Sequence, residues 1–326
     1  MKPSHAPETM SRRYAAAALA VLLIAVVLFQ SRLFLRPGFY GEEASIYYTY
    51  AWIHHWWPTL LEPHLGYYSL LDNVVTLLEA RMAHLESAFY LSFFVTLFFN
   101  WLPFTVIWLG VSPYWRTTTQ KIIASGIVLM VGQPDEVWMN LIDVQFHLCL
   151  LTFLILCETW EGRSRRCIAA YSGMLIVAGL TGVVSCLLAP LYLLRAIRER
   201  FPARWFAAVL CAACAVHIAV TGWLALHGGF AKRFDNAHPA SYVNDITIGF
   251  LNLFVPFDFH FGPLHFNPIL LVAAVPLFAC AVWYFSKPLS LYDRLLFLGG
   301  YFLIIVPSAF TSLNGVGGGR YEYAPG

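Results

Sequence analysis

Long apolar runs separated by basic turns constrain this chain more than any other feature of its sequence. A helix needs about 20 apolar residues to cross the hydrocarbon core of a membrane, and several runs approach or reach that length. Of the 326 residues, 59% are hydrophobic and 12% are charged, whereas soluble domains carry about 25% charged residues. The sequence therefore predicts an all-α protein built as a polytopic transmembrane helix bundle, and it argues against a soluble domain.

About nine membrane segments are expected. Residues 14–35 are interpreted as a retained signal anchor, because the run is long for a signal peptide and no small-residue cleavage site follows it. Residues 167–194 are too few for two full spans and too many for one, so we expect two short helices that turn near Thr181 and Gly182. The remaining expected spans are residues 88–111, 122–132, 141–157, 205–226, 268–285 and 295–311.

Two long loops interrupt this series within a single transmembrane domain that covers residues 1–326. They comprise residues 36–87 and 227–267. In the first loop, residues 66–85 place apolar side chains on one helical face and polar side chains on the other, which predicts an amphipathic helix lying in the membrane interface. Long ordered loops on one side of a protein usually carry its function.

The distribution of charge predicts an orientation. If the N-terminus is cytoplasmic and the spans alternate, cytoplasmic segments hold 14 of the 20 basic residues but 5 of the 18 acidic ones. Membrane proteins retain positive charge on the cytoplasmic side. We therefore predict a multi-pass protein of a bacterial inner membrane, with a cytoplasmic N-terminus and with both long loops in the periplasm.

Two adjacent carboxylates, Glu42 and Glu43, follow the first expected span and so face the periplasm. A carboxylate there can act as a general base toward a hydroxyl group. Asp143 enters a later span from the same side, where a charge is costly and tends to be functional. Asp135 and Glu136 lie in a plain loop, where solvation is the more ordinary interpretation. Solvation is also the alternative for the glutamate pair.

Cations are scarce on the predicted periplasmic side. Arg320, between three glycines and Tyr321, is a candidate to bind phosphate, and so are Lys232 and Arg233 in the second loop, for which a surface position is an equal alternative. Five histidines on this side lack a strong zinc-ligand spacing, so we predict no metal site from them. These histidines are His54, His55, His64, His260 and His265.

Three short motifs resemble those of the GT-C-type integral membrane glycosyltransferases, the superfamily of polyprenyl-phosphate-dependent mannosyl- and arabinosyltransferases. Residues 42–47 resemble the Asp-Glu-Ala-x-Tyr stretch that follows the first span in that superfamily. Residues 179–190 resemble its Leu-Thr-Lys-Gly-Pro segment, and residues 320–325 resemble its Arg-Tyr-x-x-Pro motif. Asp143 stands where many members have an aspartate before an apolar run.

The resemblance implies a cell-envelope enzyme that moves a sugar from a polyprenyl-phosphate donor to a hydroxyl of a lipid, glycan or protein acceptor. It implies Glu42 as the general base and Glu43 as its support, or as a ligand if a divalent cation bridges to the donor phosphate. No other cofactor and no nucleic acid is implied. The substrate-binding residues would be Asp143, Lys232, Arg233, Arg320 and Tyr321.

The sequence departs from the family pattern at two motif positions. Glu42 replaces the usual aspartate, and Gly182 replaces the lysine of the second motif. The chain also ends at the Arg-Tyr motif, so we expect further C-terminal spans to be missing.

Two other functional classes stay open. A transporter or flippase for a lipid-linked or polar solute would carry charges deep in its spans, and a non-catalytic assembly protein would not bring Glu42, Asp143 and Arg320 together.

Overall fold

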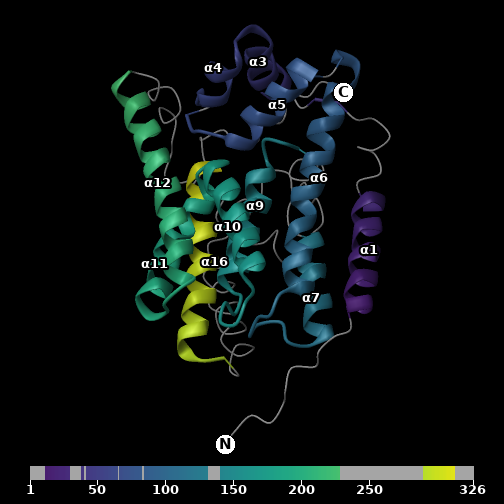
Figure 1. Cartoon of the computed structure of the whole chain (residues 1–326), viewed down its shortest axis with the longest axis vertical. Coiled ribbons are helices and arrows are strands. Elements are labelled where there is room, and N and C mark those ends of the chain that lie inside the picture. Colours follow the sequence, from purple (N-terminus) through teal and green to yellow (C-terminus); the bar gives the residue numbers. More distant parts are fainter. Residues whose placement is uncertain are drawn as a thin grey trace, which may run out of the picture.

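The computed structural model describes residues 12–29, 38–39, 42–64, 66–82, 84–130, 140–227 and 289–312. Within these ranges the regular elements are helices, which confirms the all-α class for the described part of the chain (Figure 1). The elements are α1 (Arg12–Phe29), η1 (Glu43–Tyr48), α3 (Thr49–Ile53), α4 (Trp56–Leu61), α5 (Leu70–Met82), α6 (Leu85–Leu109), α7 (Thr118–Met130), α9 (Val144–Leu156), α10 (Arg165–Leu180), η2 (Val184–Leu188), α11 (Ala189–Arg198), α12 (Ala203–Leu226) and α16 (Leu291–Ser312).

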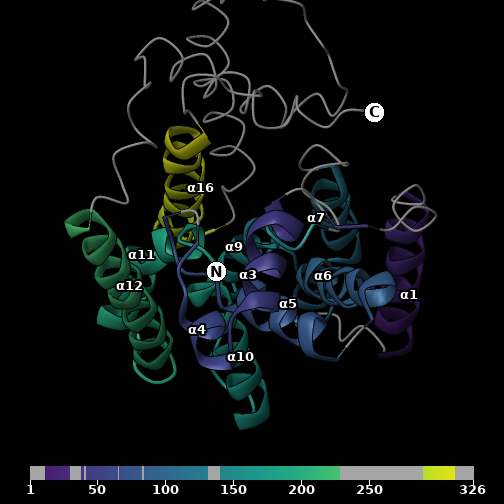
Figure 2. The same cartoon turned by 90° about the horizontal axis from the view of Figure 1, so that it is seen from above.

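The long helices form a bundle whose centre is α9. This helix packs against α6, α10 and η2, and α12 packs against α10 and α11. Leu148, Leu151 and Ile155 of α9 are fully enclosed in the main apolar core. Viewed from above, α12 and α1 stand on opposite sides of the bundle (Figure 2). The short helices α3, α4 and α5 cover one end of it (Figure 1).

Two described helices are long and apolar enough to cross a membrane. They are the segment Ser87–Leu109 of α6 and the segment Ala203–Leu226, which is α12. Shorter apolar helices occur at Arg13–Leu28 and Val144–Leu156. The expected span at residues 268–285 lies outside the described residues, and the total of about nine segments stays a prediction.

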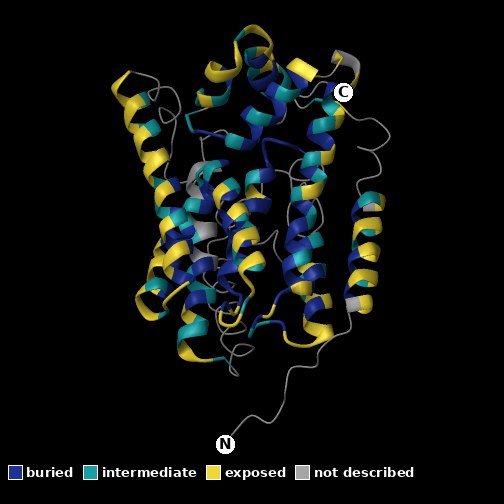
Figure 3. Cartoon of the chain, viewed as in Figure 1, coloured by how far each residue is buried: buried dark blue, intermediate teal, exposed yellow. Residues whose placement is uncertain are grey.

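The two membrane-length helices differ in burial. In α6, 56% of the most apolar stretch of 18 residues is buried within the protein, whereas in α12 the buried share of the corresponding stretch is 17%. Ile218, Trp223 and Leu226 are among the large apolar side chains that α12 exposes. Many residues of α1 are exposed as well (Figure 3). The core helix of a soluble protein would bury such a surface.

The expected pair of short helices within residues 167–194 is confirmed. The chain ends α10 at Leu180, turns through Thr181 and Gly182, and returns as η2 and α11. Gly182 has φ of +79°, a left-handed conformation that favours glycine. A Cβ atom at Gly182 would also collide with the side chain of Gln145. The backbone angle and the position of Gln145 together explain why glycine, and not a larger residue, occupies this turn.

The amphipathic helix of the first loop forms as α5, but its polar face is covered by protein. Asp72, Asn73, Thr76 and Glu79 are all buried. The reason is tertiary, because α5 packs against η1, α3, α4 and α6, and these elements cover its polar face. The position of α5 in the membrane interface stays a prediction.

Candidate functional site

Four buried carboxylates lie at the end of the bundle that α5 covers. The exposed fractions are 2% for Glu43, 1% for Asp72, 0% for Glu79 and 7% for Asp143. They come from η1, α5 and the residue before α9, and the charge of Glu43 acts on both Asp72 and Glu79. We call these four residues the carboxylate cluster. Buried acids are rare unless they are paired, so this cluster is the first candidate for a functional site.

The adjacent glutamates of the first motif have different surroundings. Glu43 begins the π-helical turn η1 and is buried, whereas Glu42 precedes this turn and is half-buried. Successive side chains on a helix point in different directions, so the two cannot enter one cavity in the same way. Glu43 joins the carboxylate cluster, and the charge of Glu42 acts on Tyr47 instead. π-Helical turns of this kind are frequent at functional sites.

Asp72 is held at the junction between α5 and the turn that follows α10. The hydroxyl of Ser69 donates a hydrogen bond to Asp72 Oδ2. The amide of Leu71 donates to Thr181 Oγ1 at 3.3 Å, and the amide of Gly182 donates to the carbonyl of Tyr68 at 3.2 Å. The expected helix pair and the first loop therefore meet directly beside Asp72.

Asp143 is oriented by a short polar turn at the start of α9. Asn140 Nδ2 donates to Asp143 Oδ2 at 2.6 Å, and the amide of Ile142 donates to Asn140 Oδ1 at 3.1 Å. Asn140 thus fixes the carboxylate and is itself fixed by the backbone. Because Asp143 acts electrostatically on Asp72, the structure brings together one residue of the first motif, one of α5 and the predicted acid before α9.

Burial raises the pKa of two members of the cluster. It raises the pKa of Asp72 well above its usual range, the charges of Glu43 and Asp143 raise it further, and the Ser69 hydrogen bond opposes the shift. Burial likewise raises the pKa of Glu79 to about 8, although the amide of Ser92 donates to Glu79 Oε1 at 2.8 Å. Carboxylic acids shifted in this way can hold and donate protons near neutral pH.

Aromatic rings lie beside the cluster. The ring of Tyr47 is 4.7 Å from that of His64, and the ring of Tyr50 stacks on His54 at 3.9 Å. Burial lowers the pKa of His64 to about 4, so this imidazole is neutral at pH 7. Tyr and His rings can provide flat surfaces for a sugar ring, and here they come from the same loop as Glu43.

The described ranges hold no group of three or more His, Cys, Asp or Glu side chains arranged to bind a metal ion. His54 and His64 pack within the aromatic group instead. Several predicted residues lie outside the described residues. These are Asp135, Glu136, Lys232, Arg233, His260, His265, Arg320 and Tyr321.

Asp72 and Glu79 are the members of the cluster that sequence reasoning did not select. They belong to a stripe of polar residues spaced three or four apart along a helix that otherwise carries large apolar side chains. This stripe was visible in the sequence, but a solvated helix face has the same pattern. Only the packing of η1 and α6 over α5 distinguishes the two arrangements.

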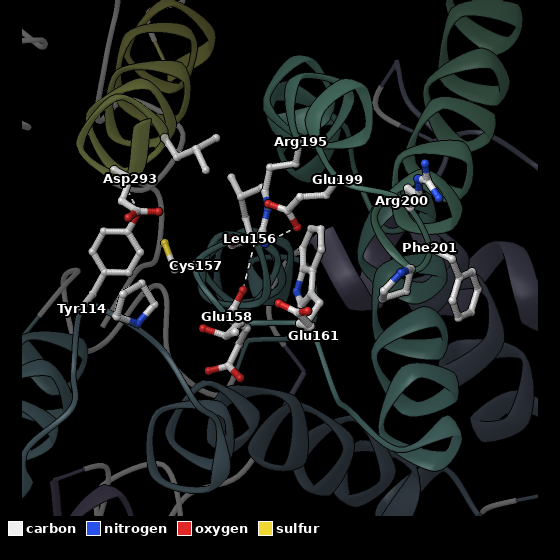
Figure 4. Close-up of a pocket in the computed structure, with 15 residues that line it drawn as sticks. Tyr114, Leu156, Cys157, Glu158, Glu161, Arg195, Glu199, Arg200, Phe201 and Asp293 are labelled. Atoms are coloured by element: carbon white, nitrogen blue, oxygen red, sulfur yellow. Dashed lines mark hydrogen bonds and ion pairs between the residues drawn. The ribbon is translucent and has the colours of Figure 1, made fainter. Parts of the chain in front are cut away.

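A second polar region lies at the opposite end of the bundle, where the basic loops meet. Here a cavity of about 580 Å³ is lined by the loops after α6, α9 and α11 and by the start of α16 (Figure 4). The guanidinium of Arg195 lies 3.5 Å from the centre of the Trp160 ring and pairs with Glu199, and Arg163 pairs with Glu158. These charges pair with one another, although Glu158 Oε1 has no hydrogen-bond partner among the described residues, and we interpret this region as a structural junction between the loops.

Across the described residues, the fold and the site define an all-α bundle with two helices of membrane-crossing length and a buried carboxylate cluster at one end. No family model matches the chain, and no curated protein or solved structure matches it.

Proposed function

We propose that the protein is an integral membrane glycosyltransferase that moves a sugar from a polyprenyl-phosphate donor to an acceptor hydroxyl on the periplasmic side. The observation that carries this proposal is the burial of Glu43 in one cluster with Asp72 and Asp143. A transferase of this kind needs a carboxylate in a water-poor site to accept the hydroxyl proton. The motif resemblance of residues 42–47 supplies the reaction class.

The membrane part of the proposal rests on apolar surface and on charge. The mostly exposed α12 presents an apolar face that suits lipid. The described arginines of the loops after α9 and α11 lie at the end opposite the carboxylate cluster (Figure 1). By the positive-inside rule, that end is cytoplasmic and the carboxylate cluster faces the periplasm. About nine membrane segments in a bacterial inner membrane complete the proposed topology.

Within this scheme we assign the base to Glu43 rather than to Glu42. Glu43 is the glutamate that is buried beside Asp72, whereas Glu42 lies at the margin. The hydroxyl oxygen of the acceptor attacks the anomeric carbon of the sugar, and Glu43 accepts the hydroxyl proton. The bond between the anomeric carbon and the lipid phosphate breaks, and the phosphate leaves. Asp143 orients the acceptor. Proposed partners of the leaving phosphate are Lys232, Arg233, Arg320 and Tyr321, with a divalent cation as an optional further partner.

A transporter is the weaker candidate on the described residues. Transporters place ionisable groups near the middle of the membrane. Here Glu43, Asp72 and Glu79 belong to the short helices that cover one end of the bundle, and Asp143 precedes its helix. This position suits a reaction at the membrane surface better than passage through the bundle.

The proposal is tested by assaying sugar transfer from labelled polyprenyl-phosphate sugars in membranes that contain the protein. Glu43→Gln should lower the transfer rate by roughly 10²- to 10⁴-fold, the usual contribution of a general base. Glu62→Gln is the matched control, because Glu62 lies in the same loop and accepts a hydrogen bond from Tyr50 outside the cluster. Equal transfer by the wild type and by Glu43→Gln would rule out the proposed base, and a larger loss in Glu42→Gln would return that role to Glu42.

A further inference from the structure

His217 is an ionisable side chain inside a helix of membrane-crossing length. It lies roughly 13 Å from the end of α12, by the rise of an α-helix. Although α12 is mostly exposed, His217 is only 4% exposed and belongs to a buried stripe with Leu210 and Ala213. Ionisable side chains within spanning helices are costly, often pair with backbone carbonyls and tend to have a function. This histidine is therefore a candidate for one.

The ring of His217 binds the carbonyl of Gly179 near the end of α10. Nε2 lies 2.9 Å from that oxygen. A carbonyl oxygen only accepts, so Nε2 carries the hydrogen and donates it. Ala213 lies one turn before His217 on the same face of α12, and a Cβ atom on Gly179 would be 2.7 Å from the Cβ of Ala213. Glycine at position 179 therefore lets α12 approach closely enough for the bond to form.

This bond satisfies a backbone group that the end of α10 leaves open. The last four carbonyls of a helix have no amide partner within it, and that of Gly179 is one of them. α9 and α11 end on backbone amides that bond back into the helix, those of Cys157 and Glu199. At Gly179 the donors are side chains instead, namely His217 and the weaker thiol of Cys186 at 3.4 Å. An unsatisfied carbonyl away from water is expensive, so the histidine stabilises the end of α10 inside the bundle.

The end of α10 sets the position of the turn that holds the first loop. In this turn, Thr181 Oγ1 accepts a hydrogen bond from the amide of Leu71 at 3.3 Å. The amide of Gly182 donates to the carbonyl of Tyr68 at 3.2 Å. Leu71 directly precedes Asp72 in α5. A series of hydrogen bonds and short backbone segments therefore leads from the middle of α12 to the carboxylate cluster.

We propose that His217 is a positioning residue for the carboxylate cluster, because its hydrogen bond to Gly179 fixes the end of α10 and, through the turn that follows, the place of Asp72. His217 acts through this turn and not on the reacting atoms. Its effect on sugar transfer rests on the proposed function, whereas its effect on the turn does not. A histidine that only added stability would weaken the whole bundle evenly when replaced.

Hydrogen–deuterium exchange of the purified full chain tests this role without a substrate. His217→Gln keeps an amide N–H near the place of Nε2, whereas the side chain in His217→Asn is too short to bring one there. His217→Asn should therefore raise the exchange rates of the Leu71 and Gly182 amides, and His217→Gln should keep the wild-type rates. The amide of Ser92, which donates to Glu79 in the same cluster, is the internal control and should be unchanged in both variants.

The possible results separate positioning from general stability. Wild-type exchange in folded His217→Asn would overturn the proposal, and so would equal increases in the two variants. An increase that affects Ser92 to the same extent would show a general loss of stability instead. Where His217→Asn does not fold, Thr181→Val decides, because it removes the acceptor of the Leu71 amide. A raised Leu71 rate there, with His217→Gln like the wild type, would support the proposal, and an unchanged rate would overturn it.

The sugar-transfer assay adds a readout that a purely structural residue would not move. His217→Asn should lower the turnover number by roughly 2- to 10-fold, the equivalent of one hydrogen bond, and leave KM unchanged, since the cluster acts in the transfer step. His217→Gln should keep most of the wild-type turnover. Equal turnover in wild type and His217→Asn would contradict this inference alone. If the wild type transfers no sugar while the exchange results are as expected, the proposed function fails and the positioning of the turn stands.

Discussion

The amide of Gly182 donates a hydrogen bond to the carbonyl of Tyr68 at 3.2 Å, which joins the turn between α10 and η2 to the segment that leads into α5. Beside it, the amide of Leu71 donates to Thr181 Oγ1. These contacts connect residues more than 100 positions apart in the chain. They bring the buried carboxyl group of Asp72 to the centre of the bundle end, and the stability of the site therefore depends on this turn.

Gly182→Ala should destabilise the protein. The backbone at position 182 is left-handed, a conformation that is less favourable by about 1–2 kcal/mol for a residue with a side chain than for glycine. The added methyl group would also displace Gln145. Thermal unfolding in detergent measures the change. Gly173→Ala is the control, because open space surrounds that position in α10, and alanine there should be neutral or stabilising by up to about 1 kcal/mol. Equal unfolding temperatures for the two variants would contradict the role of the turn.

Arg195→Met should destabilise the loops at the other end of the bundle. The Arg195 guanidinium donates to the carbonyl of Glu158 at 3.0 Å and to Glu199 Oε1 at 2.8 Å. Leaving the buried carbonyl of Glu158 unpaired costs roughly 1–3 kcal/mol in the free energy of unfolding. Arg198→Met is the control, since the exposed Arg198 stacks on the ring of Tyr292, and its loss should cost no more than about 1 kcal/mol. Denaturant titration of both variants distinguishes them, and equal losses would contradict the prediction.

The free energy of unfolding should fall as the pH rises from about 4.5 to about 8. The pKa of Glu79 is raised from 4.5 to about 8, so the folded state binds a proton that the unfolded state releases in this window. The stabilising effect is complete below the unfolded pKa and is lost as the pH passes the folded one. Asp72 adds a slope of the same sign, because its pKa is raised too.

Glu79→Gln should flatten this pH dependence by at most about 1.4 kcal/mol per pH unit, the value for one proton. Unfolding measured across the window in wild type and variant provides the comparison. The control Glu62→Gln, outside the carboxylate cluster, should keep the wild-type slope. An unchanged slope in Glu79→Gln would show that Glu79 does not bind the proton.

Ile218→Lys should impair membrane integration. Ile218 is 72% exposed on α12, and a lysine within a spanning helix costs about 2.5–3.5 kcal/mol. The measurement is the fraction of protein that stays in the membrane after an alkaline wash. The control Ile197→Lys is similarly exposed, but it lies next to Arg198 at the basic end and should be tolerated. Full retention of Ile218→Lys would argue that the α12 face does not contact lipid.

The sequence predicted much of the helical framework because helix formation depends on local properties. Apolar runs predicted α6 and α12 to within a few residues, and the short length and flanking charges of residues 167–194 predicted the turn at Gly182. Motif position pointed to Glu42 as the base, to Glu43 as its support and to Asp143. Their function stays a prediction, as do the residues beyond position 227 that the resemblance selected.

The sequence by itself determined the helical class, the two membrane-length segments and the positions of the acids along the chain. Tertiary structure decided which of those acids come together. The polar stripe of α5 has the same pattern whether water or protein covers it, and only the packing of η1 and α6 over the helix buries Asp72 and Glu79. Burial then raises the pKa of both groups, because desolvation depends on neighbours that are distant in the chain.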